Sequence, residues 1–367
     1  MRLLICTGIF PPEIGGPATY SKTLAAEFSK RGHEVMVITY SDKESGIRNY
    51  ESRLKFPVNR ISRSWFKPWH YYKYFRAVKK HGRWADLIYA QDPVSAGYPS
   101  YLASRILKKP FAVKITGDYS WEQATSRGLT DKMIDEFQNL ESYSGPIKKI
   151  RRIQVRVCKE ARLVIVPSEY LKRIVLGWGV KEKRIKVIYN AIKQPDLRIS
   201  KEEARQKHGI SADDFLIVSA GRNVPWKGFS LLREVVDELK QTNPHIRLEI
   251  LHEAPQQTLH QYIKAADVFV LNTAYEGLSH ILVEAMAIGT PIITTNVCGN
   301  PEVVEDGKTG ILIEFNNTEQ LRQAIAQIMA DAGLRQKYSG NGQEILTKFS
   351  FDKMIEETER ILKECAS

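Results

Sequence analysis

The chain alternates short apolar runs with helix-like segments, and the alternation stops near residue 200 and then begins again. Leu3 to Thr7 is an apolar run typical of a buried parallel strand, Ala18 to Arg31 has helical spacing, and Glu34 to Tyr40 is again strand-like. Strand, helix and strand in this order make a βαβ unit. The pattern predicts an α/β fold with two doubly wound parallel sheets.

The length also favours two domains, because one core rarely grows beyond about 250–300 residues and the chain has 367. Residues 190–200 have the composition of a linker, so we expect a first domain at 1–195 and a second at 196–350. In the second, we expect strands at 215–220, 247–251, 268–272 and 291–295 and helices at 229–240, 258–265, 279–288 and 318–330, followed by an amphipathic helix at 351–365.

The composition excludes several classes of protein. No window approaches about 18 uncharged apolar residues, so no membrane-spanning helix is expected. The four cysteines are far apart and form no CxxC pair, which excludes a zinc ribbon and argues against a disulfide scaffold. The apolar run at the start is too short for a signal peptide. We therefore expect a cytoplasmic protein.

Charge is distributed unevenly along the chain. Residues 1–200 contain 37 Lys/Arg and 18 Asp/Glu, a balance of +19, whereas residues 201–367 contain 17 and 24, a balance of −7. A basic domain joined to an acidic one suggests that only the first meets a polyanion or an anionic membrane. A Lys-rich surface without such a partner is the alternative.

Two loops carry the candidate chemistry, and each lies between a predicted strand and a predicted helix. In the loop from Gly221 to Gly228, Arg222 and Lys227 suit a diphosphate, and the following helix adds its positive end. In the second loop, Gly277 allows a close approach of the backbone and Ser279 is a candidate N-cap. Ordinary solvated loops are the alternative interpretation of both.

Two carboxylates accompany the second loop. Glu276 precedes the predicted helix and Glu284 lies within it. Beside a phosphate site they would be repelled unless they accept hydrogen bonds from hydroxyls, so vicinal diols of a ribose or a hexose are the natural partners. The alternatives are a loop cap for Glu276 and a solvent-facing helix residue for Glu284. In the first domain, Gly15 and Gly16 precede a helix and admit a phosphate or sugar, although a glycine pair more often marks only a turn.

The stretch 267–310 resembles the retaining glycosyltransferases of family 4. The resemblance rests on Asp267-Val-Phe-Val-Leu-Asn-Thr273, on the Glu276-x7-Glu284 pair and on Gly299-Asn-Pro-Glu302, with weaker similarity at 166–172 and 188–192. It implies the B-type fold of two facing Rossmann-like domains. It also implies that the C-terminal helix, 351–367, crosses back to the first domain.

The resemblance implies a role for each matching residue. Arg222 and Lys227 match the pair that holds the donor diphosphate, and Glu284 matches the residue on the nucleotide ribose. The remaining matches are Glu276 on the transferred sugar, the amides of Gly277, Leu278 and Ser279 on the phosphate, and Gly15 and Gly16 in the N-terminal donor loop.

The sequence departs from the family in two places. Many members have a histidine after the strand that matches 111–115, whereas this chain has Thr116-Gly117-Asp118. Asp118 is a candidate for the catalytic role of that histidine, and the alternative is that this role is dispensable. The second domain is also shortened. It has a single strand-like run between the helices ending near Lys240 and beginning near Thr258.

The expected activity is retaining transfer of a sugar from a nucleoside diphosphate sugar to a glycan or lipid-linked acceptor in cell-envelope polysaccharide or glycolipid synthesis. No Asp-x-Asp pair follows a strand, and His252 and His260 have no carboxylate at metal spacing, so we expect neither a metal nor another cofactor. The alternatives are a nucleotide-sugar epimerase of similar fold and a nucleic-acid-binding protein. No recognisable nucleic-acid motif favours the latter.

Two basic segments of the first domain favour a membrane surface. Residues 64–80 mix seven aromatic side chains with lysine and arginine, and residues 145–159 are basic and amphipathic. Trp and Tyr favour the lipid headgroup region, and Lys and Arg favour anionic lipids. We therefore expect peripheral contact with the inner face of the cell membrane. Aromatic packing on the sheet beneath a solvated charged face is the alternative.

Overall fold

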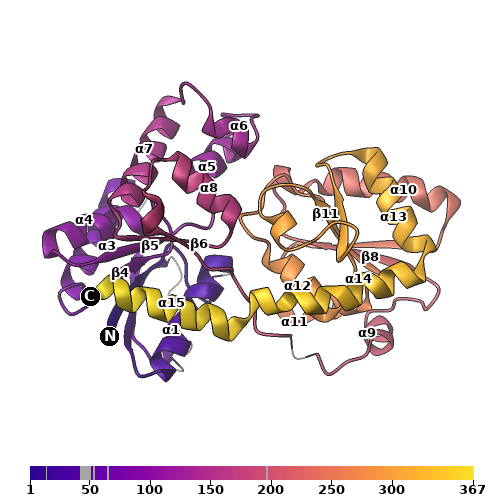
Figure 1. The fold of residues 1–367 in the computed structure, drawn as a ribbon, viewed down its shortest axis with the longest axis horizontal. Coiled ribbons are helices and arrows are strands. Elements are labelled where there is room, and N and C mark those ends of the chain that lie inside the picture. The colour runs from indigo at the N-terminus through magenta and orange to yellow at the C-terminus, as the bar shows by residue number, and fades with distance from the viewer. Residues whose placement is uncertain (14, 42–50, 53, 64–65, 196) are drawn as a thin grey trace. The chain divides into compact units, whose positions relative to one another are not determined.

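The computed structural model describes residues 1–367 except 14, 42–50, 53, 64–65 and 196, and it forms two compact units (Figure 1). The first comprises residues 1–167, 171–188 and 355–367, and the second comprises 168–170 and 189–354. The second unit begins a few residues earlier than expected. The C-terminal stretch 355–367 is part of the first unit.

The described part of the first unit contains a seven-stranded parallel sheet, in the order β3-β2-β1-β4-β5-β6-β7. The strands are β1 (Arg2–Cys6), β2 (Glu34–Ser41), β3 (Val58–Ser62), β4 (Leu87–Ala90), β5 (Phe111–Lys114), β6 (Leu163–Val166) and β7 (Ile185–Val187). The order reverses between β1 and β4, which makes this a doubly wound sheet. β4 and β6 are apolar and buried, as strands covered on both faces must be. β1 is so after the exposed Arg2, and β5 is buried up to and including Lys114.

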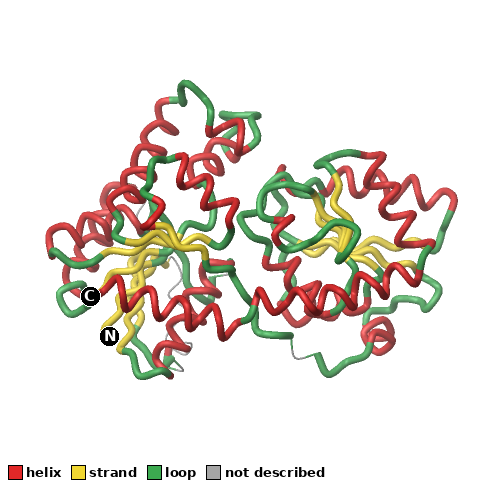
Figure 2. The backbone as a smooth tube through the Cα atoms, in the orientation of Figure 1, coloured by secondary structure: helices red, strands yellow, loops and turns green. Residues whose placement is uncertain are grey.

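Helices lie on both sides of this sheet (Figure 2). They are α1 (Gly16–Lys30), α3 (Lys67–His81), α4 (Gly97–Leu107), α5 (Tyr119–Ser126), α6 (Ile134–Gln138), α7 (Gly145–Glu160), α8 (Glu169–Gly177) and α15 (Phe351–Ala366). Glu359 of α15 forms ion pairs with Arg31 and His33 at 2.9 Å each. These contacts join the end of the chain to the first βαβ unit.

The second unit has a five-stranded parallel sheet among its described residues, in the order β12-β11-β10-β8-β9. The strands are β8 (Phe215–Ala220), β9 (Ile246–Leu251), β10 (Val268–Leu271), β11 (Ile292–Thr295) and β12 (Gly310–Ile313). The helices are α9 (Lys201–Lys207), α10 (Phe229–Thr242), α11 (Gln256–Ala265), α12 (His280–Ile288), α13 (Thr318–Ala330) and α14 (Ala332–Ile345). The prediction of two doubly wound sheets is confirmed. Only β9 lies between α10 and α11, so the shortened second domain is confirmed as well.

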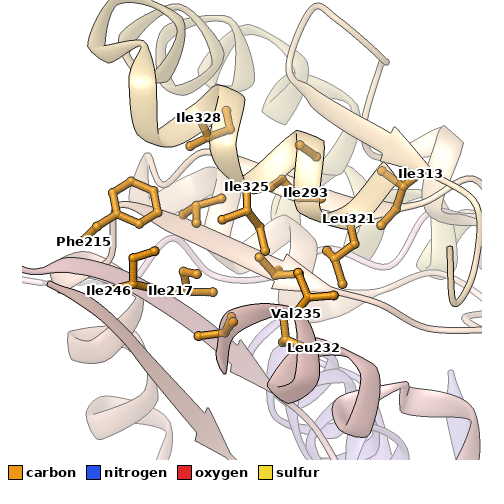
Figure 3. Close-up of a cluster of buried hydrophobic side chains, with 14 of the residues drawn as sticks. Phe215, Ile217, Leu232, Val235, Ile246, Ile293, Ile313, Leu321, Ile325 and Ile328 are labelled. Carbon is orange, nitrogen blue, oxygen red and sulfur yellow. The ribbon is translucent and has the colours of Figure 1, made fainter. Parts of the chain in front are cut away.

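The core of the second unit lies between the sheet and helices α10 and α13 (Figure 3). From the sheet, Ile217 and Val270 are fully buried. Leu232 of α10 and Ile325 of α13 are buried against them. Helical spacing places Leu232, Val235 and Val236 on one face of α10, which explains how this amphipathic helix fixes the position of the loop that precedes it.

Candidate active site in the second unit

The two candidate loops meet at the point where the strand order of the second sheet reverses. β8 and β10 are neighbours in the sheet but not in the sequence, so the loops that follow them emerge side by side. The amide of Ala274 donates to the carbonyl of Trp226 at 2.8 Å, and the Thr273 hydroxyl donates to the same carbonyl at 3.1 Å. Ligands of doubly wound sheets bind beyond the carboxyl ends of strands at this switch point.

Gly228 allows the two loops to approach closely. It has a left-handed backbone, with φ of 52°, and it is the N-cap of α10. A Cβ at this position would lie 2.5 Å from the carbonyl oxygen of Asn272. Asn272 also donates to the carbonyl of Gly228 at 3.2 Å. A side chain at residue 228 would therefore push apart the ends of β8 and β10.

Lys227 and Glu276 form an ion pair across the two loops, with their side chains mostly buried. The structure thus brings together two residues that lie far apart in the sequence. Arg222 is exposed and makes no ion pair or hydrogen bond with any described residue. Among the described residues of the site, Glu276 therefore balances the charge of Lys227, whereas Arg222 is available to bind an anion.

The N-terminus of α12 lies beside this ion pair. Ser279 is the N-cap residue, as predicted, but its side chain makes no capping hydrogen bond. Its Oγ is buried and lacks a partner among the described residues. Gly277 and Leu278 precede it, and the carbonyl of Gly277 accepts a hydrogen bond from Ser168 at 2.6 Å. Amides at a helix N-terminus have no intrahelical partner and carry partial positive charge, so this group suits an anion.

Glu284 lies one turn further along α12 and is buried, so the solvent-facing alternative is wrong. Gln256 donates to its Oε1 at 3.2 Å. His260 Nε2 lies 3.4 Å from its Oε2. These partners could not be predicted from the sequence, because Gln256 and His260 belong to α11 and precede Glu284 by more than twenty positions.

The remaining site candidates belong to the first unit. Gly15 is the N-cap of α1, and Gly16 begins that helix. A Cβ on Gly15 would press against the side chain of Ile9. Nothing lies within 4 Å of a Cβ at Gly16, so only Gly15 has a local structural reason to be glycine. The contact of the pair with a donor stays a prediction.

Asp118 occupies a position that does not suit the catalytic role expected of it. It is fully buried and caps α5, accepting from the amides of Ser120 and Trp121. Its carboxylate also accepts hydrogen bonds from Ser120 Oγ, Gln138, Gln154 and Arg151 at 2.6, 2.8, 2.9 and 3.2 Å. Both oxygens are therefore engaged by the protein. The geometry argues for a structural role in joining α5, α6 and α7.

No group of three or more His, Cys, Asp or Glu side chains that could hold a metal occurs among the described residues. Nor does any helix described here have the length and apolar character needed to cross a membrane.

Family models identify the class of protein to which this site belongs. Residues 14–194 match the model described as Glycosyltransferase Family 4, and residues 247–345 match the model described as Glycosyl transferases group 1. Together the two matches cover most of both units. The chain therefore belongs to the family-4 glycosyltransferases.

Particular relatives agree with this assignment. An uncharacterized glycosyltransferase of Methanocaldococcus jannaschii is 27% identical over 399 aligned positions, which cover 99% of this chain and 98% of that protein. The lipopolysaccharide core biosynthesis glycosyltransferase LpsE of Rhizobium meliloti is 30% identical over 39% of this chain and 47% of its own length.

Among solved structures, HepE of Anabaena in complex with UDP-glucose superposes with a TM-score of 0.75 at 19% identity, covering 99% of this chain and 100% of HepE. At that identity the likeness shows the fold alone. The predicted B-type glycosyltransferase fold is confirmed.

Proposed function

We propose that the protein is a retaining, metal-independent glycosyltransferase that uses a nucleoside diphosphate sugar as donor. The observation that carries this proposal is the convergence of the Lys227–Glu276 pair, the α12 N-terminus and the buried Glu284 at one switch point. Lys227 and the amides at the α12 N-terminus fit a diphosphate, Glu276 fits a sugar and Glu284 fits a ribose diol. The structural relative HepE binds UDP-glucose.

Each group has a distinct part in the proposed reaction. Arg222 and Lys227 bind the diphosphate, together with the amides of Gly277, Leu278 and Ser279. Glu284 accepts hydrogen bonds from the ribose. Lys227 contacts Glu276 before the donor binds. The arriving diphosphate attracts the lysine, and the freed carboxylate of Glu276 accepts hydrogen bonds from the transferred sugar.

The chemical step needs no covalent intermediate on the protein. The bond between the anomeric carbon and the diphosphate oxygen breaks, and the acceptor oxygen bonds to the same face of that carbon. The acceptor's proton passes to the leaving diphosphate, which acts as the base. Negative charge grows on this leaving group, and the cations stabilise it electrostatically in place of a divalent metal.

The acceptor in this proposal is a glycan or a lipid-linked glycan of cell-envelope polysaccharide or glycolipid synthesis. LpsE, a partial relative, is named for lipopolysaccharide core biosynthesis. The positive first half of this chain also suits an acceptor that is presented at an anionic surface.

Helix α3 is the proposed membrane-facing element of a cytoplasmic, peripherally bound protein. Its outer face exposes Phe66, Trp69 and Tyr72, which are 54%, 52% and 46% exposed, followed by the exposed cations Arg76 and Lys80. A cavity of about 690 Å³ borders the basic end of the helix. Residues 64 and 65, which begin the predicted membrane-binding segment 64–80, lie outside the part of the chain that the structure describes. The aromatic end fits the headgroup region and the basic end fits lipid phosphates.

Product stereochemistry tests the proposed reaction. The protein is incubated with UDP-glucose and extracted envelope glycolipid in EDTA, and the new anomeric linkage is identified by NMR. An α-linked product formed without metal supports the proposal, since the donor is α-linked. A β-linked product contradicts retention. An epimerised sugar nucleotide formed without acceptor supports the epimerase alternative.

A further inference from the structure

Helix α11 reaches the carboxylate of Glu284 from two successive turns. Gln256 and His260 are four positions apart and so lie on the same face of the helix. Gln256 donates to Oε1 at 3.2 Å, and His260 Nε2 lies 3.4 Å from Oε2. Each carboxylate oxygen therefore has one partner from α11.

The histidine is not simply a surface residue near a charge. His260 is only 8% exposed, and its Nε2 is buried and forms no hydrogen bond with any described residue, so its 3.4 Å approach to Glu284 is a close polar contact without hydrogen-bond geometry. A carboxylate oxygen can only accept, so the contact is attractive when Nε2 carries the proton. A buried carboxylate without such partners would be costly and poorly oriented.

Helix α11 itself is held firmly in the second unit. Its Tyr262 stacks on His208 with ring centroids 4.2 Å apart, and the Thr290 hydroxyl donates to the carbonyl of Ile263 at 2.7 Å. Only four residues, 252–255, connect it to β9. A short connection and fixed packing make α11 a rigid support for the groups it directs at Glu284.

We infer that His260 is a positioning residue that orients the Glu284 carboxylate for the ribose diol, and that it thereby sets the preference for ribonucleotide over 2′-deoxyribonucleotide donors. A carboxylate has about four lone-pair sites; Gln256 donates to one oxygen of Glu284, and His260 lies beside the other. In this inference, the lone-pair sites that Gln256 does not occupy accept hydrogen bonds from the two ribose hydroxyls. This inference rests on the proposed function, which gives Glu284 its ribose.

The test compares ribose preference in matched variants. Calorimetry measures the Kd of UDP, GDP and ADP and of their 2′-deoxy forms in EDTA, and the ratio for each pair is the readout. The variants are His260→Leu, which keeps volume, His260→Gln, which keeps a donor, and Glu284→Gln as the reference. His245→Leu, at an exposed histidine of the same unit, is the control.

We expect His260→Leu to lower the ratio by about three- to tenfold, the effect of removing one close polar partner of a charged group. His260→Gln should restore most of it, and His245→Leu should leave it unchanged. General loosening of the fold would weaken both ligands equally and leave the ratio intact. If the ratio is unchanged in His260→Leu but lost in Glu284→Gln, the inference about His260 is overturned and the proposed function is not. An unchanged ratio in Glu284→Gln overturns the proposed ribose role and the inference with it.

Discussion

The candidate site residues differ in whether neighbouring protein groups already satisfy their hydrogen-bonding capacity. Asp118 is saturated by donors from three helices, which leaves nothing for a substrate. Ser279 is the opposite case, because its hydroxyl is buried at a helix N-terminus and has no partner in the described structure. A group that is desolvated without compensation is costly to keep, so its presence at Ser279 favours a ligand.

Ser279 and Asn317 offer a matched pair of helix caps. Asn317 caps α13 through a hydrogen bond from the amide of Gln320 at 3.0 Å. We expect Asn317→Ala to cost about 1 kcal/mol of stability and to leave nucleotide affinity unchanged. Ser279→Ala should cost less than about 0.5 kcal/mol but weaken nucleoside diphosphate binding by about three- to tenfold. Urea unfolding and calorimetry separate the two effects, and equal losses of stability would contradict this account of Ser279.

Gly228 and Gly209 are matched for backbone conformation but not for surroundings. Both have left-handed φ, 52° and 62°, but only Gly228 has close neighbours, since nothing lies within 4 Å of a Cβ at Gly209. Gly209→Ala should cost about 1 kcal/mol, the price of the left-handed conformation. Gly228→Ala should cost at least about 2 kcal/mol more and weaken nucleotide binding, because the backbone must shift. Similar unfolding free energies for Gly209→Ala and Gly228→Ala would show that the loops after β8 and β10 can move apart without loss of stability.

At the level of helices and strands, prediction from the sequence depended on continuous apolar runs. β8 and β10 are such runs and were predictable, whereas Asn59 and Arg60 interrupt the apolar residues of β3. The loops after β8 and β10 could be located from their glycines and charges. The support of Glu284 by α11 and the saturation of Asp118 could not, because those contacts join residues of separate helices.

Helix α15 has a pH-sensitive attachment to the first unit. Partial burial alone would raise the pKa of Glu359, but hydrogen bonds from Lys363, His33 and Arg31 outweigh it and lower the pKa to about 2 from an ordinary 4.5. The folded state thus favours the ionised carboxylate. Its contribution is fully present above about pH 5 and is lost as the pH falls from there toward 2.

Thermal unfolding of Glu359→Gln checks this attachment. We expect the variant to lose about 1–3 kcal/mol at pH 7, with the difference from wild type shrinking between pH 5 and 2.5. Glu364→Gln removes an exposed i,i+4 pair of the same helix and should change stability by less than about 0.5 kcal/mol. A Glu359→Gln deficit that stays constant with pH would contradict the assignment.

At the scale of the whole molecule, the two halves of the chain carry opposite charge, +19 and −7. In the proposed function, the basic half meets an anionic surface and the second unit binds the donor. The exposed aromatic and basic face of α3 is the part of the first unit that we expect to contact the anionic surface.

Vesicle sedimentation tests the membrane contact. Binding to phosphatidylglycerol vesicles should be strong at low salt and weak at high salt, because exposed charges are screened. The double variants Trp69→Ala/Tyr72→Ala and Arg76→Gln/Lys80→Gln should each weaken it by about tenfold. The controls Ile106→Ala/Leu129→Ala and Lys181→Gln/Lys183→Gln change equally exposed side chains elsewhere in the first unit. Equal vesicle binding by all four double variants would show that α3 does not contact the membrane.

In the proposed site, fixed cations of the second unit bind a nucleoside diphosphate without metal. Calorimetry of UDP, GDP and ADP in EDTA and in magnesium measures this binding. We expect one nucleotide to bind equally in both buffers. Arg222→Ala and Lys227→Ala should each weaken binding by at least about tenfold, whereas Lys207→Ala, at an exposed lysine of the same unit, should not. Binding that requires magnesium, or that survives both substitutions, would contradict the account.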